Sequence, residues 1–269
     1  TGVSCPAVLV FLLAHSGLQA LQRMGMPAVS SVKSAREQAI LVFSKPAHIS
    51  RTDSSEPYAS LPWGAIDTLF SAFVVDVLNH ASEVAGTDVI FYRNAGEPLD
   101  EFLYPLRDKV VFADLPGGTF AEQVRYAVEK AFADGYGRMI VVLDNHPTLP
   151  AKMFERIFAQ LAYEEECVVV GPSREGKNFL IGLKAEYEGL FDTAGADPIN
   201  RPNVLLERLC RLDALLFVTE QRYMIDSGYH VAKLREEVVL PDGAPSAAAR
   251  TQEVFRILDK KYRIRFSPR

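Results

Sequence analysis

Cysteine is scarce in this chain: Cys5, Cys167 and Cys210 are far apart and form no C-x-x-C pair. This pattern argues against a disulfide framework and against a structural zinc site. The apolar run Ala7–Ala14 is much shorter than the roughly 20 residues that cross a bilayer. The run is therefore too short to be a membrane span, and because no basic segment precedes it, we expect no secretory signal peptide. The cysteine pattern favours a protein of the reducing cytoplasm.

Neither sign of charge predominates. The 269 residues include 29 Lys and Arg against 34 Asp and Glu, which gives a net charge of −5. Without a long basic run, we expect no nucleic-acid partner, although a local basic pocket for phosphates remains compatible with this balance. A composition of 48% hydrophobic and 23% charged residues is typical of a globular protein.

Three well-known motifs are also missing: G-x-G-x-x-G, G-x-x-x-x-G-K-[ST] and G-x-S-x-G. The glycine-containing turn Leu115-Pro-Gly-Gly118 matches none of them. Dinucleotide binding, a P-loop and a serine-hydrolase elbow therefore have no motif in their favour. A nicotinamide-dependent oxidoreductase likewise has no motif in its favour, because the G-x-G-x-x-G fingerprint is absent.

Short β-branched runs alternate with segments of helical periodicity, which predicts an α/β fold with a mostly parallel sheet. A four-turn apolar stripe from Ile66 to Ala81 indicates a core helix, and Thr119-Phe-Ala-Glu122 has the spacing of a capping box. The expected strands are Ala39–Phe43, Asp88–Tyr92, Lys109–Ala113, Met139–Leu143, Cys167–Gly171, Phe179–Leu183 and Leu215–Thr219.

These signals predict three parts. Residues 1–37 form an N-terminal extension, residues 38–240 the main domain, and residues 241–269 a linker and a C-terminal amphipathic helix. The linker is indicated by Pro241-Asp-Gly-Ala-Pro-Ser246. The basic end of the chain could bind a membrane surface or a partner, but packing against its own domain is the commoner arrangement.

In an open α/β sheet, ligands bind where loops leave the carboxyl ends of strands. The strand Met139–Leu143 is followed by Asp144, Asn145 and His146. Alternate residues of an extended segment share a face, so Asp144 and His146 could hold a divalent ion that bridges a diphosphate. The alternative is a turn in which Asp144 and Asn145 satisfy backbone donors.

Two further loops carry charged candidates. The loop Gly171–Lys177 contains Glu175 and Lys177, which could contact a phosphate or a sugar, or could belong to a solvated hairpin turn. After the first strand, Lys45 is the natural phosphate partner, and Arg51 follows it.

Taken in order, these segments resemble small bacterial GT-A-like glycosyltransferase-like proteins, whose relatives include nucleotidyltransferases of cofactor biosynthesis. The similarity runs from Gln38 to Glu237. It implies a three-layer α/β/α nucleotide-diphospho-sugar transferase fold and a nucleotide over the first half of the sheet. It also implies Mg²⁺ or Mn²⁺ at the loop after Leu143, with Asp226 in Tyr223-Met-Ile-Asp-Ser227 as a further metal ligand. The segments that carry the similarity are Gly118–Val124, Ala131–Leu143, Pro147–Leu149, Val168–Pro172 and Phe179–Leu183.

This sequence departs from the family pattern at three loops. The Lys-Thr-Arg that follows the first strand is absent although Lys45 is kept, and the family's Asp-Gly-Gly turn reads Glu175-Gly-Lys177. If the prolines align, Asn145 stands where the family has an aspartate. Either Asp144 and His146 have replaced that aspartate as a D-x-H variant, or this copy has lost metal-dependent chemistry.

We therefore expect a metal-dependent transferase that uses a nucleotide sugar or a nucleoside triphosphate. In this hypothesis phosphate is contacted by Lys45, Arg51 and Lys177, and Mg²⁺ or Mn²⁺ is held by Asp144, His146 and Asp226. The catalytic residues are Asp144 and Glu175, with Glu175 as the acceptor-side base. The alternative is a catalytically degenerate binding or regulatory protein on the same scaffold. The sequence leaves a homo-oligomer open.

Overall fold

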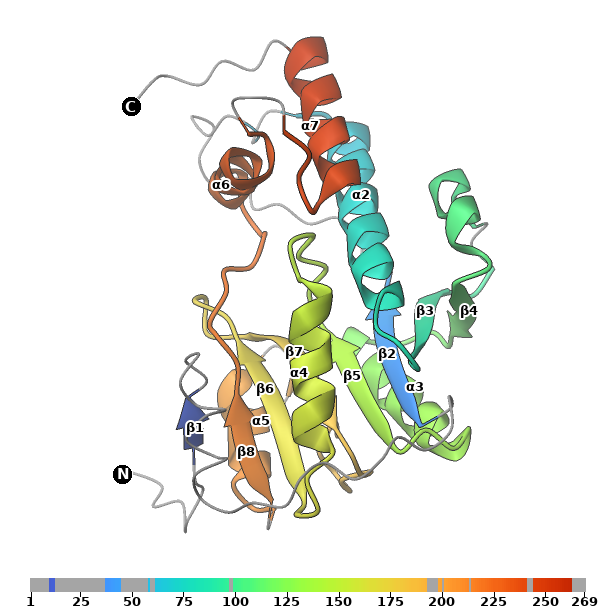
Figure 1. The fold of residues 1–269 in the computed structure, drawn as a ribbon, viewed down its shortest axis with the longest axis vertical. Coiled ribbons are helices and arrows are strands. Elements are labelled where there is room, and N and C mark those ends of the chain that lie inside the picture. The colour runs from blue at the N-terminus through green and yellow to red at the C-terminus, as the bar shows by residue number, and fades with distance from the viewer. Residues whose placement is uncertain are drawn as a thin grey trace.

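A single mixed sheet organises the fold (Figure 1). The computed structural model describes residues 10–12, 37–44, 58, 61–96, 99–192, 198–199, 201–212, 214–240 and 244–262. Within these residues the sheet has eight strands in the order β1-β8-β6-β7-β5-β2-β3-β4, and β7 alone runs antiparallel to its neighbours. The strands are β1 (Val10–Leu12), β2 (Gln38–Phe43), β3 (Asp88–Asn94), β4 (Val110–Leu115), β5 (Arg138–Val142), β6 (Cys167–Pro172), β7 (Asn178–Leu183) and β8 (Leu215–Val218).

Helices cover both faces of this sheet. The described helices are α2 (Trp63–Ser82), the short 3-10 helix η1 (Glu101–Leu106), α3 (Phe120–Ala133), α4 (Ala151–Leu161), α5 (Pro202–Leu209), α6 (Gly228–Val238) and α7 (Ala249–Tyr262). The predicted capping box is confirmed at the start of α3, where Thr119 and Glu122 satisfy each other's backbone amides. The predicted three-layer fold with a mostly parallel sheet is confirmed.

The buried side chains form separate clusters because successive residues of a strand point to opposite faces. Ile40 and Val42 pack with α2 and α4, whereas Leu41 and Phe43 pack with α3 and α5. The sheet is thus covered on both faces, as its continuous apolar runs predicted.

A third cluster lies beyond the carboxyl edge of the sheet. It joins the first half of α2 to α6 and α7, which stand together at the top of Figure 1. The helix α7 is fixed there by polar contacts: Asp259 accepts hydrogen bonds from Tyr58 and Arg235 at 2.7 and 2.9 Å. The C-terminal amphipathic helix therefore packs against its own chain.

The structure differs from the expected part boundaries at the N-terminal end. Residues 1–37 were expected to lie outside the domain, yet Val10–Leu12 forms the edge strand β1 and pairs in parallel with β8. A short apolar run can add backbone hydrogen bonds to an open sheet edge, a non-local pairing that local periodicity does not reveal. No helix among the described residues is long and apolar enough to cross a membrane.

Candidate functional site

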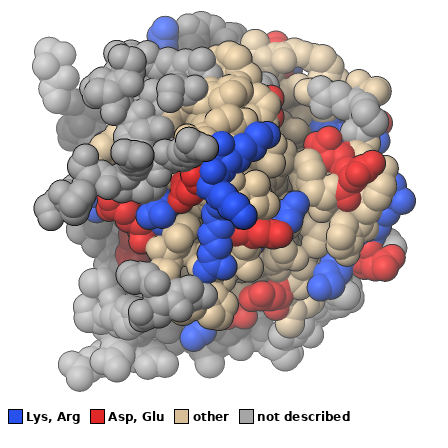
Figure 2. All heavy atoms as spheres, turned by 90° about the horizontal axis from the view of Figure 1, so that it is seen from above, with Lys and Arg blue, Asp and Glu red and all other residues tan. Residues whose placement is uncertain are grey.

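The carboxyl edge of the sheet gathers three polar loops. They follow β5, connect β6 to β7, and lead from β8 to α6; because β5, β6 and β8 point the same way, all three emerge at one edge. Seen from this end, Lys and Arg side chains lie near the centre of the face, with Asp and Glu beside them (Figure 2). This edge is where an open α/β sheet binds ligands.

In the loop after β5, Asp144 and Asn145 make different hydrogen bonds. The backbone amide of Asp144 donates to the carbonyl of Phe179 at 3.1 Å, which keeps the loop against β7. The side chain of Asn145 donates from Nδ2 to the carbonyl of Phe43 at 2.9 Å and so joins the ends of β5 and β2. An aspartate could not donate this bond, so the amide at residue 145 has a structural role.

This contact makes Asn145→Asp a test of that role. The new carboxylate would face the Phe43 carbonyl, which would lose its side-chain donor, and we expect a loss of about 1–3 kcal/mol in the free energy of unfolding. Urea unfolding measures the loss. The matched control is Asn203→Asp on the exposed first turn of α5, where a negative charge is neutral or slightly stabilising. Equal stability of the two variants would contradict the assignment.

His146 is a buried side chain, with 1% of its surface exposed. Its Nδ1 lies 3.1 Å from the hydroxyl oxygen of Thr148, which also accepts a hydrogen bond from Arg222. Its ring stands edge-on to Tyr223 at 4.8 Å between centroids. Burial, together with the nearby charges of Arg222, Lys233 and His230, lowers the pKa of His146 to about 3, so the imidazole is neutral at physiological pH.

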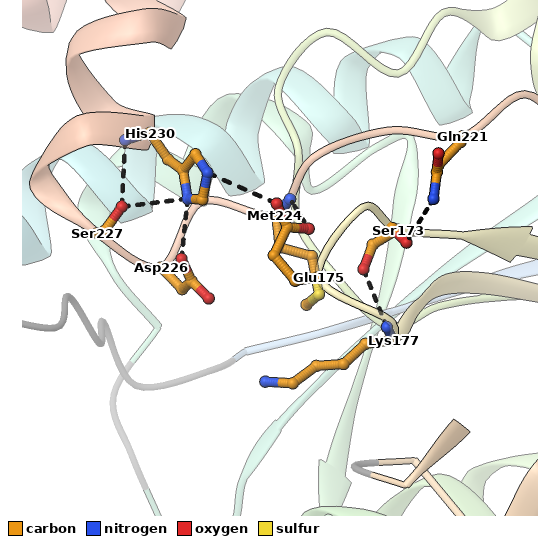
Figure 3. Close-up of polar contacts among 8 residues, drawn as sticks. All are labelled: Ser173, Glu175, Lys177, Gln221, Met224, Asp226, Ser227 and His230. Atoms are coloured by element: carbon orange, nitrogen blue, oxygen red, sulfur yellow. Dashed lines mark hydrogen bonds and ion pairs between the residues drawn. The ribbon is translucent and has the colours of Figure 1, made fainter. Parts of the chain in front are cut away.

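The β6–β7 hairpin and the segment after β8 cross at this edge. Ser173 pairs with Arg222 as an isolated bridge, and the amide of Arg174 donates to the carbonyl of Arg222 at 2.8 Å. Gln221 donates from its side chain to the carbonyl of Ser173 at 3.0 Å. The turn closes when the amide of Lys177 donates to the hydroxyl of Ser173 at 3.1 Å (Figure 3). The crossing brings the Glu175 loop to the segment that carries Asp226.

Glu175, His230 and Asp226 form a carboxylate–imidazole–carboxylate cluster (Figure 3). Nδ1 of His230 lies 2.9 Å from Oδ1 of Asp226, and Nε2 lies 3.5 Å from Oε1 of Glu175. The other carboxylate oxygen of Glu175 accepts a hydrogen bond from the amide of Met224 at 2.9 Å. Ser227 caps α6 and also contacts Nδ1 at 3.1 Å. The imidazole is thus held from both sides while 43% of the Asp226 side chain stays exposed.

The predicted site residues fall into three groups. Glu175 and Asp226 are joined through His230, whereas Asp144 and His146 belong to the neighbouring loop. Tyr223 links the two loops, because its ring contacts His146 and stacks on His230 at 5.5 Å. Lys45 and Arg51 lie outside the described residues.

The three predicted metal ligands are not arranged as a preformed cage. Among the residues that the structure describes, no three His, Cys, Asp or Glu side chains are placed to share one ion. His146 Nε2 is buried and has no hydrogen-bond partner in that part of the chain. The ligand roles of Asp144, His146 and Asp226 stay predictions.

Sequence reasoning missed His230, Arg222 and Thr148 as parts of this edge. One local signal was present: Asp226 and His230 are four residues apart, and Ser227 between them is a residue type favoured at helix N-caps. The contact between Thr148 and Arg222 spans 74 residues, and no local pattern predicts such a pair.

Comparison with known proteins shows which solved structure shares this fold. Residues 77–195, fewer than half of the chain, match a family described as "Uncharacterized protein conserved in bacteria (DUF2064)". A "putative nucleotide-diphospho-sugar transferase" from Desulfovibrio desulfuricans G20 shares the fold, with a TM-score of 0.63 and 22% identity over 84% of this chain and 97% of that one. The resemblance to GT-A-like transferases is therefore confirmed for the fold. No curated protein matches the chain.

Two other solved structures show weaker likeness. A 4-diphosphocytidyl-2C-methyl-D-erythritol synthase has a TM-score of 0.47 and 16% identity over 74% of this chain and 99% of its own. A mannosyltransferase from Pyrobaculum calidifontis, solved with GDP-Man and Mn²⁺, has a TM-score of 0.43 and 9% identity over 93% of this chain and 82% of its own. The conclusion on the fold rests on the first structure alone.

Proposed function

We propose that this protein is a transferase that binds a nucleotide sugar or a nucleoside triphosphate at the carboxyl edge of its sheet. It would transfer the glycosyl or nucleotidyl group to a small acceptor. The observation that carries the proposal is the meeting of three loops at one edge of a GT-A-like sheet, with Asp144, the Glu175–His230–Asp226 cluster and several cations within it. Carboxylates and cations at one ligand-binding edge suit a phosphorylated donor.

A divalent cation fits this edge if the substrate completes its ligand set. Mg²⁺ is usually held by one or two carboxylates and by substrate phosphates and water, not by an all-protein cage. Asp144 and the exposed Asp226 would supply the carboxylates, whereas the buried Nε2 of His146 is less suited. The bound metal would offset charge on the leaving diphosphate.

Glu175 would act on the acceptor. Its Oε2 is fixed by the amide of Met224, and its Oε1 faces His230. A carboxylate held in one orientation can accept a proton from an acceptor hydroxyl in a defined direction. His230 would keep Glu175 and Asp226 in place and is a positioning residue in this scheme.

The proposal is tested by donor consumption with a panel of nucleotide sugars and nucleoside triphosphates, each with Mn²⁺ and with chelator. We expect Asp144→Asn to lower metal-dependent turnover by about 100-fold or more, because it removes a carboxylate from the metal. The control Asp67→Asn changes an exposed acid on α2 and should retain activity. Turnover that needs no metal, or that survives in Asp144→Asn, would contradict the mechanism.

A second candidate, a nucleotide-binding or regulatory protein without transfer activity, is favoured by one observation. Asn145, which stands at the position of the family aspartate if the prolines align, uses its side chain to hold Phe43 and offers no carboxylate. This candidate predicts nucleotide binding that is indifferent to metal and to Asp144→Asn, with no consumption of any donor in the panel.

A further inference from the structure

Arg222 is a half-buried cation that forms no ion pair with any residue that the structure describes. It makes two contacts through Nη1, to the hydroxyl and the carbonyl oxygen of Thr148 at 3.2 and 3.5 Å. Its Nε is buried and has no hydrogen-bond partner among the described residues. Burial lowers the pKa of Arg222, while Glu220 and Glu237 counteract this from a distance without forming an ion pair in that part of the chain.

Such an arrangement is costly and calls for an explanation. A partly desolvated charge is normally paired. Six other Lys and Arg side chains of the described chain do form ion pairs with carboxylates at 2.6–3.7 Å, namely Arg93, Arg125, Lys130, Arg138, Arg235 and Arg250. A buried polar group that is left unsatisfied in a native structure calls for an explanation such as a catalytic role or a bound water or ion.

Other cations are carried by the elements next to Arg222. The hairpin that pairs with it carries Arg174 and Lys177, and α6 places Nζ of Lys233 4.0 Å from the ring centre of Tyr223, the next residue. Arg174, Lys177 and Lys233 also form no ion pair with any described carboxylate. Both Arg222 and Tyr223, over whose ring Lys233 lies, belong to the segment beside His146: Arg222 contacts Thr148, and the Tyr223 ring contacts His146.

We infer that Arg222, with Lys233 and the hairpin cations beside it, binds a phosphate group of a substrate at this edge. A planar guanidinium can hold two phosphate oxygens at once, and Thr148 fixes its direction through Nη1. The inference rests on the proposed function only for the identity of the substrate. The phosphate belongs either to the donor diphosphate or to a phosphorylated acceptor.

The test is a calorimetric titration of the full chain with inorganic phosphate and with pyrophosphate, without metal and without nucleotide. We expect saturable binding of pyrophosphate that weakens at least about tenfold in Arg222→Gln, because a charge-assisted bidentate contact is lost. Arg222→Lys should retain part of the affinity. The control Arg211→Gln, an exposed arginine after α5, should leave binding unchanged.

Two results would overturn the inference: no saturable binding by the wild type, or equal affinity in Arg222→Gln and the wild type. If Arg222→Gln does not fold, Lys233→Gln is titrated instead; a loss of about threefold or more supports the site, and unchanged affinity overturns it. Repeating the titration with saturating nucleoside diphosphate separates the two sources, since competition indicates the donor diphosphate and independent binding indicates the acceptor.

A failure of this phosphate-binding inference can be told apart from a failure of the proposed transferase function. Phosphate binding at Arg222 needs neither metal nor turnover, so it can be present in a protein that consumes no donor. Conversely, donor consumption by a wild type that shows no saturable binding of pyrophosphate would remove the inference and leave the transferase proposal standing.

Discussion

Asp76→Ala is expected to lower the free energy of unfolding by about 2–4 kcal/mol. Asp76 is 2% exposed on α2, and its two carboxylate oxygens accept from the backbone amides of Arg250 and Thr251 at 3.0 and 2.8 Å. These amides belong to the first turn of α7, which has no partner for them within its own helix. Alanine would leave both amides unsatisfied at a buried contact.

The size of this effect is a balance of two contributions. Burial raises the pKa of Asp76 although both amides lower it, so desolvation of the carboxylate offsets part of its bonding. Leaving two amides unsatisfied still outweighs that cost. Urea unfolding with Asp67→Ala on the exposed face of α2 as control measures the difference. A loss below about 0.5 kcal/mol in Asp76→Ala would show that the two contacts of Asp76 do not help to hold α7.

His146 is expected to make the protein sensitive to acid. The pKa of His146 is lowered to about 3, mainly by burial, from an ordinary value of 6.5. The unfolded chain therefore binds a proton below about pH 6.5 that the folded protein does not bind until about pH 3. Stability from this group is fully present above the ordinary pKa, and it is lost as the pH falls through that window.

The measurement compares urea unfolding of the wild type and His146→Gln at several pH values from 7 to 4. The wild type should lose more stability than the variant, by up to about 1.4 kcal/mol for each pH unit below about 6. Because glutamine does not titrate, the difference between the two pH profiles gives the contribution of His146 without that of other groups. Parallel pH profiles would contradict a neutral, buried His146.

Much of the fold follows from local patterns in the chain. Continuous apolar runs such as Met139–Leu143 are typical of strands covered on both faces, and the apolar stripe of α2 predicted a core helix. The stripe did not reveal that α2 serves two clusters, its second half on the sheet and its first half on α6 and α7. Pairings across the chain, such as β1 with β8, are also set by packing that local periodicity does not encode.

The site was predictable only in part, for the same reason. Strand ends and loop charges indicated Asp144, Glu175 and Asp226, because the carboxyl edge of a sheet collects such residues. The burial of His146 depends on Tyr223, and the cluster of Glu175 and Asp226 depends on His230. Tyr223 lies far along the chain from His146, and His230 lies far from Glu175. Local spacing could therefore suggest which residues carry chemistry but not which of them come together.

We propose above all that the carboxyl edge of the sheet binds a nucleotide diphosphate group with a divalent metal. Calorimetric titration with a panel of nucleoside diphosphates and nucleotide sugars, with Mn²⁺ and with chelator, tests it most directly on the wild type and Asp144→Asn. We expect at least one member of the panel to bind saturably, and we expect this binding to require Mn²⁺ and to be lost in Asp144→Asn. Binding that is absent throughout, or unchanged by chelator and by the substitution, would contradict it.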